Sequence, residues 1–144
     1  MSNRTLGDVV ANRTFISAPG SSSVRDAAIR MAESQVGAIL VVDDERLVGI
    51  FTERDLLNRV MARRLDPDST PLSAVMTPDP RAEPPELLLS QALVTMYEGC
   101  YRHLPVVEDG RLLGVVSARD AMGEDLIEFE RELTRRDKIT EIII

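Results

Sequence analysis

The chain has 144 residues, of which 44% are hydrophobic and 3% aromatic, and it contains no tryptophan. This length suits one compact domain or two very small ones, with a core of aliphatic side chains and methionine. The net charge of −7 argues against nucleic-acid binding, because phosphate recognition needs a basic face. No apolar run approaches about 18 residues, and the N-terminus has no apolar signal segment, so we predict no membrane partner and a cytoplasmic location.

The residue types that carry catalysis or bind metals are sparse. Cys100 is the single cysteine, which fits a reducing compartment, and we expect it to be a small buried hydrophobic residue. His103 is the single histidine, and no neighbouring residues have the spacing of metal ligands. No pattern of a Ser-His-Asp triad or a Walker loop is present. The sequence therefore predicts no catalytic residues, no metal site and no required cofactor.

An internal repeat organises the chain. Residues 24–55 align without a gap with residues 89–120, and 11 of these 32 positions are identical. Upstream, residues 6–10 resemble residues 72–76 at an offset of 66, one more than the offset of 65 in the main alignment. The chain therefore consists of two homologous units that differ by one residue in the loop before the first helix.

Each unit has the hydrophobic pattern of a βαββα repeat. In the first repeat, apolar residues at helical spacing begin at Val24, and residues 21–23 offer serines as its N-cap. The other elements of this repeat are an opening strand at 15–16, a hairpin of strands 38–42 and 47–51, and a closing helix at 53–63. In the second repeat the first helix begins near Leu89. The later elements are hairpin strands at 104–107 and 112–116 and a closing helix at 118–125.

These elements divide the chain into four segments. The first repeat occupies residues 5–64 and the second occupies 87–123. Six of the eight prolines fall in residues 65–86, which we expect to form an irregular connector containing one helical turn at 72–76. Residues 124–144 read as an added helix, with Leu126, Phe129 (or Glu130) and Leu133 along one side, followed by an apolar tail from 139. We expect another surface or a partner chain to cover this tail.

One pattern recurs where the second hairpin strand of each repeat enters the closing helix. It is a glycine, two apolar residues, a hydroxyl residue, any residue, an arginine and an aspartate, at 49–55 and at 114–120. One interpretation is helix capping. Thr52 and Ser117 would accept hydrogen bonds from free N–H groups, and Asp55 and Asp120 would complete capping boxes. The glycine would then serve only the entry of the strand.

The same atoms also suit a ligand. A helix start offers N–H donors to a phosphate, and Arg54 and Arg119 would add positive charge beside it. The carboxylates of Asp55 and Asp120 could each accept two ribose hydroxyl protons. The pattern by itself favours capping and leaves binding open.

The order Asp-Ala-Ala-Ile-Arg-Met-Ala-Glu, then Gly-Ala-Ile-Leu-Val-Val-Asp, then Leu-Val-Gly-Ile-Phe-Thr-Glu-Arg-Asp-Leu resembles a cystathionine β-synthase (CBS) domain. A second copy carries Gln-Ala-Leu-Val-Thr-Met, Tyr-Arg-His-Leu-Pro-Val-Val-Glu and Leu-Leu-Gly-Val-Val-Ser-Ala-Arg-Asp-Ala. The resemblance covers about residues 5–123. It implies a CBS pair, or Bateman module, with an α+β fold of two βαββα repeats packed through their sheets about a pseudo-two-fold axis, here followed by a C-terminal helix.

The resemblance also implies a regulatory role in signal transduction, a homodimer, and clefts that bind AMP, ADP, ATP, S-adenosylmethionine or NAD. By matching motif positions, Asp55 and Asp120 would hold the ribose, and Thr52 and Ser117 would contact ribose or phosphate. The loops before the hairpins would flank the adenine or phosphate; their residues are Val36, Gly37, Ala38, Tyr101, Arg102 and His103. Ser17 would line the first cleft. Its counterpart is Ala82 or Glu83, so the second site departs from the first.

Two functions follow from these expectations. The first is a sensor of adenosine-containing nucleotides that regulates an unidentified protein. The second is a ligand-free dimerisation or adaptor module, which the departure at 82–83 and the apolar tail favour. Neither function requires the chain to be an enzyme.

Overall fold

The computed structural model describes the backbone of residues 3–143 and the side chains of residues 3–137. Within this part the chain forms two compact units. We name them by the repeat whose hairpin each contains. The repeat-one unit comprises Thr14–Arg81 with Gly110–Leu112. The repeat-two unit comprises the chain up to Arg13, then Ala82–Asp109 and the chain from Leu113 onward.

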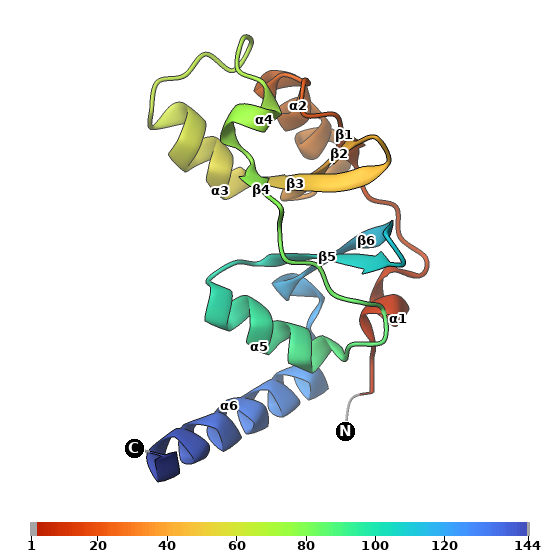
Figure 1. Cartoon of the computed structure of the whole chain (residues 1–144), viewed down its shortest axis with the longest axis vertical. Helices are drawn as coiled ribbons and strands as arrows, with labels where there is room; N and C mark the ends of the chain where they lie inside the picture. Colours follow the sequence, from red (N-terminus) through yellow and green to blue (C-terminus); the bar gives the residue numbers. More distant parts are fainter. Residues whose placement is uncertain (1–2, 144) are drawn as a thin grey trace. The chain divides into compact units, whose positions relative to one another are not determined.

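The repeat-one unit is a four-stranded sheet with helices on one face (Figure 1). The sheet order is β1-β2-β3-β4, with β1 parallel to β2 and the other neighbours antiparallel. The strands are β1 (Ser17–Ala18), β2 (Ala38–Asp43), β3 (Arg46–Thr52) and β4 (Thr77–Pro78). The helices are α2 (Val24–Ser34), α3 (Glu53–Asp55), which continues as a π-helical stretch over Leu56–Met61, and α4 (Leu72–Val75).

The core of this unit lies between the sheet and its helices. Its buried residues are Ala18, Val24, Ala27, Met31, Ile39, Val41, Phe51, Val60, Leu72 and Val75. Val24, Ala27 and Met31 occupy the helical spacing expected from the sequence. The predicted N-cap is confirmed, because the Ser23 hydroxyl accepts a hydrogen bond from the N–H of Asp26 at 3.1 Å.

The repeat-two unit contains a two-stranded hairpin with α1 and α5 on one side, and α6 runs beside α5 (Figure 1). Its elements are α1 (Leu6–Val10), α5 (Leu89–Gly99), β5 (His103–Glu108), β6 (Arg111–Ser117) and α6 (Gly123–Ile143). The buried residues of its core are Leu6, Val9, Val10, Leu89, Ala92, Leu93, Met96, Leu104, Val106 and Val116. Phe129 on α6 packs against this core and meets Tyr97 of α5 edge to face, with ring centroids 5.8 Å apart.

Both predicted hairpins are present, with turns at the expected positions. Asp44 and Glu45 have φ angles of 50° and 62°, and Asp109 and Gly110 have 51° and 78°. Two successive left-handed residues match the twist of antiparallel strands. Each hairpin is therefore closed by a two-residue turn of the favoured kind.

The compact units do not coincide with the order of the repeats along the chain. The segment before the first repeat's opening strand packs with the second repeat, and the proline-rich connector packs with the first. The hydrogen bonds are equivalent in the two units. The N–H of Leu6 donates to the carbonyl of Leu87, and that of Leu72 donates to the carbonyl of Ser22, both at 2.9 Å. Each unit is thus completed by a helical turn from outside its own βαββα core.

The glycine of the shared pattern makes this close approach feasible. A Cβ placed on Gly49 would lie 2.2 Å from the Met76 sulfur, and one on Gly114 would lie 2.9 Å from the Cβ of Val10. Both contacts are shorter than van der Waals distance. The glycine therefore accommodates the inserted turn, which is a wider role than the strand entry inferred from the sequence.

Several boundaries differ from the sequence expectations. The opening strand is at Ser17–Ala18, not 15–16. The connector is not merely irregular, because Leu72 and Val75 of its helical turn are buried in a core. In the second repeat, a single 3₁₀ turn, Ala118–Asp120, replaces the helix expected at 118–125. The α6 helix then begins at Gly123, so the helix we treated as an addition takes the place of the second repeat's closing helix.

The chain from residue 138 onward is described by its backbone alone. The α6 helix extends past the expected end at 138 to Ile143. Whether the apolar side chains from 139 are covered is a question outside the described side chains. Of the expected apolar side, Phe129 and Leu133 are partly buried and Leu126 is exposed.

Cys100 is exposed, so the prediction that it is buried was wrong. It follows the last residue of α5 in a left-handed conformation, with a φ of 58°. Gln35 has the same role after α2, with a φ of 55°. A left-handed residue ends a helix where the chain turns away, which leaves the Cys100 side chain in solvent.

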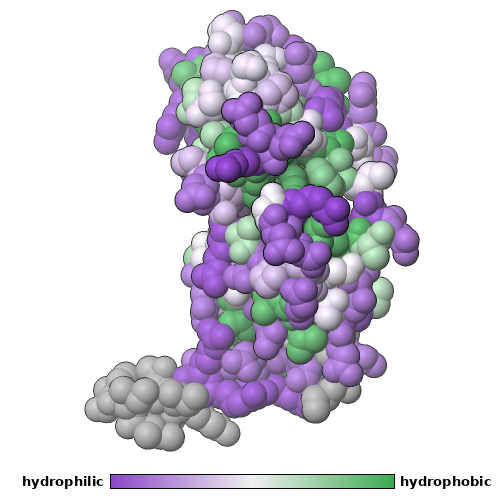
Figure 2. Space-filling model, turned by 45° about the vertical axis from the view of Figure 1, so that its right-hand side comes forward, coloured by the Kyte–Doolittle hydropathy of each residue, from purple (hydrophilic) through white to green (hydrophobic). Residues whose placement is uncertain are grey.

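Hydrophilic side chains cover most of the face shown in Figure 2, with hydrophobic residues in smaller patches. Charged residues make up 28% of the sequence. Among the described residues, no helix combines the length and the apolar character needed to cross a membrane.

Candidate functional site

The strand-to-helix junction of the first repeat is a complete capping box. The Thr52 hydroxyl accepts a hydrogen bond from the N–H of Asp55 at 3.2 Å, and Asp55 Oδ2 accepts one from the N–H of Thr52 at 3.0 Å. The capping interpretation of the pattern is therefore present in the structure. It engages only one of the two carboxylate oxygens.

The junction of the second repeat has a similar arrangement. Asp120 Oδ2 accepts a hydrogen bond from the N–H of Ser117 at 2.8 Å, and the Ser117 hydroxyl accepts one from the N–H of Arg119 at 3.2 Å. This hydroxyl bonds one residue earlier than the Thr52 hydroxyl does, because the turn is 3₁₀ and not α-helical. Both junctions thus hold the aspartate by its Oδ2 atom.

The second carboxylate oxygen meets an arginine in both repeats, but not the same arginine. Asp55 Oδ1 lies 3.5 Å from Nε of Arg59, one helical turn further along. Asp120 Oδ1 lies 2.7 Å from a terminal guanidinium nitrogen of Arg13. The two carboxylate side chains are 13% and 11% exposed, so each is accessible at an edge. The Oδ1 atom is therefore the oxygen of each aspartate that the capping bond does not engage.

The pattern arginines, Arg54 and Arg119, are not the arginines that pair with these carboxylates. Both residues are exposed, and no hydrogen bond or ion pair of either guanidinium occurs within the described part of the chain. Each could therefore turn toward an anion without breaking an existing contact. That freedom suits phosphate binding.

The loop before each hairpin meets the junction through its backbone. The carbonyl of Gly37 accepts a hydrogen bond from the N–H of Glu53 at 3.0 Å, and that of Arg102 accepts one from Ala118 at 2.9 Å. Ala38 lies opposite Thr52 in the sheet register. The structure therefore brings Gly37, Ala38 and Arg102 to the junctions.

The other predicted site residues lie in less direct positions. Val36 lies two residues after the end of α2 and is 41% exposed, whereas its counterpart Tyr101 packs against the core of the repeat-two unit. His103 is the first residue of β5. Ser17 begins β1, and its carbonyl accepts a hydrogen bond from Arg30 at 2.5 Å. No contact joins Ser17 to the aspartate of its own repeat within the described residues.

The sheet register settles the counterpart of Ser17. Ala18 lies opposite Val41 in the first repeat, and Glu83 lies opposite Val106 in the second. Since Val41 and Val106 are equivalent repeat positions, Glu83 matches Ala18 and Ala82 matches Ser17. The second repeat therefore has no hydroxyl at this position.

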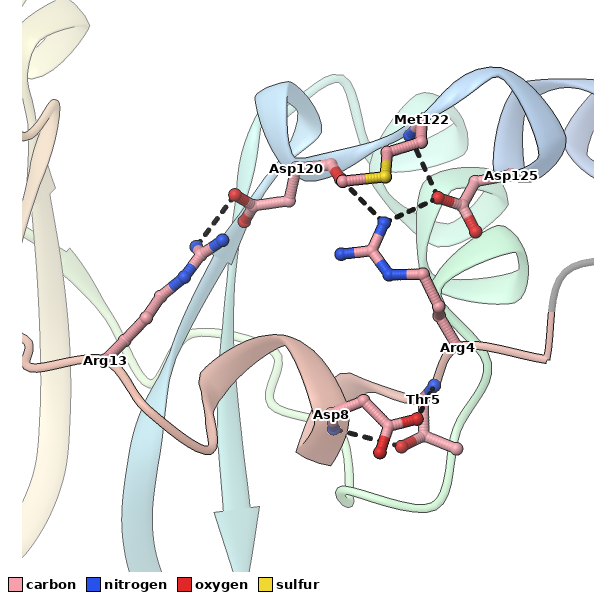
Figure 3. Close-up of polar contacts among 7 residues, drawn as sticks. All are labelled: Arg4, Thr5, Asp8, Arg13, Asp120, Met122 and Asp125. Atoms are coloured by element: carbon pink, nitrogen blue, oxygen red, sulfur yellow. Dashed lines mark hydrogen bonds and ion pairs between the residues drawn. The ribbon is translucent and has the colours of Figure 1, made fainter.

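Sequence reasoning missed the arginines that come from the N-terminal segment (Figure 3). Arg13 reaches Asp120 from one side. On the other side Arg4 donates to the backbone carbonyl of Asp120 at 3.2 Å and forms an ion pair with Asp125 at 2.9 Å. One sequence signal could have pointed to Arg13. At the offset of 66 that aligns residues 6–10 with 72–76, the equivalent of Arg13 is Asp79, so the charge is reversed between the repeats.

Fold and junctions together define a tandem α+β repeat protein with one candidate ligand position in each repeat. A model of the CBS domain matches residues 6–62 and 72–126. The chain therefore belongs to the CBS domain family and carries the domain twice.

Similar proteins come from plants, bacteria and archaea. The CBS domain-containing protein CBSCBSPB1 of Arabidopsis thaliana is 35% identical over 117 residues, 81% of this chain, but the chain spans only 22% of that protein. A solved structure of a protein with CBS domains from Burkholderia ambifaria has a TM-score of 0.76 at 31% identity, covering 81% of this chain and 89% of that one. A CBS domain protein from Pyrobaculum aerophilum, solved in complex with AMP, has a TM-score of 0.80 at 28% identity, covering 88% of this chain and 98% of that one.

Proposed function

We propose that this chain is a regulatory, non-catalytic module that binds an adenine nucleotide at both strand-to-helix junctions. The observation that carries the proposal is the pair of aspartates, Asp55 and Asp120. Each has a partly exposed side chain, is fixed by a capping bond to Oδ2, and has Oδ1 beside an arginine. A carboxylate oxygen is a hydrogen-bond acceptor, so Oδ1 can receive a ribose hydroxyl. The AMP complex of the Pyrobaculum aerophilum relative supports the choice of ligand class.

The roles of the surrounding groups follow from their positions. Oδ1 of each aspartate accepts a ribose hydroxyl, and Oδ2 stays in the cap. Arg54 and Arg119 swing from solvent onto the phosphate. The backbone at Gly37 and Arg102 lies beside the junction and borders the ligand. Binding would regulate a second activity by favouring one state of the module, to the extent that the ligand binds that state more tightly.

Replacing Asp55 and Asp120 with asparagine tests the ribose assignment. Asparagine retains an oxygen for the capping bond but replaces the second acceptor with an N–H₂ donor. A bond to a charged group contributes about 1.5–3 kcal/mol, so each single variant should weaken AMP at its own site by about 10- to 100-fold. Isothermal titration calorimetry with AMP should show two sites in the parent, one unchanged and one weakened site in each single variant, and two weakened sites in the double variant.

Asp8→Asn provides a matched control. Asp8 and Thr5 form a capping box with bonds of 2.9 and 3.1 Å at the start of α1, and neither is one of the candidate ligand residues. These bonds, above all the one from the Thr5 backbone, hold the pKa of Asp8 below its usual value of 3.8. The control should bind AMP like the parent. Unweakened binding in the double variant would contradict the ribose role. Titrations with ADP, ATP, S-adenosylmethionine and NAD rank the alternative ligands, and no response to any of them would leave only the adaptor function.

We further propose that the chain forms a homodimer through apolar side chains at matched repeat positions. Leu57 and Met61 of the repeat-one unit are 63% and 58% exposed, and Met122 and Leu126, 65 residues later, are 63% and 47% exposed. Exposed apolar patches on a small protein commonly mark an interface, and we propose that each pair contributes to one. Each pair follows directly on a candidate ligand junction, which also suits an adaptor function.

Glutamate substitutions test the dimer. Met61→Glu combined with Met122→Glu should convert the dimer to a monomer, measured by light scattering during size-exclusion chromatography. Ile29→Glu is the control, since Ile29 is also 47% exposed but its repeat counterpart, Val94, is buried. An unchanged mass in the double variant would place the interface elsewhere.

A further inference from the structure

The Arg13 guanidinium forms an ion pair with Oδ1 of Asp120, which is the atom that the proposed ribose would need in the second repeat. The ion pair is 2.7 Å long, and the Arg13 side chain is 45% exposed. Asp120 Oδ2 is already engaged by the N–H of Ser117. Within the described residues, the guanidinium of Arg13 has Asp120 as its single partner. A hydroxyl that takes the position on Oδ1 would therefore leave Arg13 without its counter-charge.

The first repeat has a different arrangement. The position of Arg13 is taken by Asp79, and the arginine near Asp55 is Arg59, at the longer distance of 3.5 Å. Arg59 is also anchored by the carbonyls of Val75 and Met76, at 3.3 and 3.0 Å. A ligand at Asp55 can therefore approach without displacing an arginine from its main contacts.

We propose that Arg13 determines specificity at the second junction, so that this site accepts ribose only from ligands that also carry an anionic group such as a phosphate. The inference rests on the proposed nucleotide function. A ribose hydroxyl displaces the guanidinium from Asp120 Oδ1, and the displaced guanidinium then pairs with the phosphate. Arginine suits this exchange because its planar fork matches both carboxylate and phosphate geometry. A nucleoside without phosphate offers no replacement partner, so it binds weakly at this site.

The same reasoning predicts a difference between the two repeats. At the first junction the matched residue, Asp79, is acidic and offers nothing to a phosphate. Discrimination between AMP and adenosine there depends only on Arg54 and on the anchored Arg59. The second junction should therefore be the more selective for a phosphate, although both carry the same family pattern.

The experiment compares AMP with adenosine at one site at a time. In an Asp55→Asn background the first junction is weakened, so tight binding comes from the second junction. Calorimetry then gives the ratio of the dissociation constants of adenosine and AMP at that junction. We expect AMP to bind at least about tenfold more tightly than adenosine, the effect of one bond to a charged group. Adding Arg13→Gln should lower this ratio about tenfold, partly by weakening AMP and partly by improving adenosine. Arg13→Lys keeps the charge and should retain most of the preference for AMP.

Two controls isolate the role of Arg13. Arg131→Gln removes a positive charge from an exposed ion pair with Glu128 on α6, and it should leave the ratio unchanged. In an Asp120→Asn background, where the first junction reports, Arg13→Gln should also leave the ratio unchanged.

The outcomes separate this inference from the function on which it rests. If the Arg13→Gln variant binds both ligands with the parent ratio, Arg13 is not a specificity residue and the nucleotide function stands. If the Asp55→Asn protein binds neither ligand, the second junction is not a nucleotide site, and both proposals fail there. Arg13→Gln should also improve adenosine binding. If Arg13 only contacted the phosphate, its loss would weaken AMP and leave adenosine unchanged.

Discussion

Replacing Leu72 with alanine should lower the free energy of unfolding by about 2–5 kcal/mol, the range for removing a buried leucine side chain. Leu72 lies in the proline-rich connector, where a sequence reading expects tolerance to substitution. Its side chain is nevertheless fully buried, among Val24, Phe51 and the rest of the repeat-one core. The cost arises from the lost apolar contacts and from the cavity that remains, since the surrounding sheet and helices relax only partly.

Leu65→Ala is the matched control, because Leu65 belongs to the same connector but is 40% exposed. Its cost should stay below about 1 kcal/mol. Urea unfolding followed by circular dichroism measures both variants. Equal effects would show that the connector does not complete the repeat-one core. Leu6→Ala, at the equivalent and equally buried position of the repeat-two unit, should reproduce the effect of Leu72→Ala.

Replacing Arg4 with glutamine should lower the free energy of unfolding by about 2–3 kcal/mol. The Asp125 side chain is 1% exposed and forms an ion pair with Arg4 at 2.9 Å. Removing one member of a buried pair costs about 3–5 kcal/mol, because the other charge remains buried. The expected cost of about 2–3 kcal/mol is smaller than for a fully buried pair, because Arg4 is 31% exposed and water screens part of the interaction.

A double-mutant cycle measures the coupling directly. Arg4→Gln, Asp125→Asn and the double variant are unfolded in urea, and the coupling energy should be about 1–2 kcal/mol. The control is Arg25→Gln, which breaks an exposed ion pair with Asp68. The Arg25 and Asp68 side chains are 52% and 62% exposed. This variant should cost less than about 1 kcal/mol. A coupling energy near zero would mean that the Arg4–Asp125 pair does not fasten the N-terminal segment to the start of α6.

The repeats and their hairpins could be predicted from the sequence because their signals are local. Alternating or helical placement of apolar residues predicts each element, and Asp44 with Glu45 marks a tight turn. The capping boxes at Thr52 and Ser117 were predictable for the same reason, since each box lies within four consecutive residues. The first helix of each repeat is likewise confirmed, at α2 and α5.

Errors concerned burial and the exact course of elements, which residue type and apolar spacing alone do not determine. Cys100 was expected to be buried by its residue type, but its left-handed position after α5 exposes it. The helical turn expected in the connector is confirmed at Leu72–Val75, but the burial of both residues in a core was not predicted, because it depends on contacts with distant residues. The closing helix expected at 118–125 is replaced at its start by one 3₁₀ turn, Ala118–Asp120, and α6 begins at Gly123.

The amino-acid sequence by itself determined that the chain holds two CBS repeats and that each carries a hydroxyl, an arginine and an aspartate at a strand-to-helix junction. Only the tertiary structure decided which segment completes each core and which arginine meets each aspartate. The physical reason is separation along the chain. Arg4 and Asp120, for example, are 116 residues apart, and no local pattern encodes their contact. Such pairs require the N-terminal segment to pack on the second repeat, and they make two junctions of the same pattern chemically different.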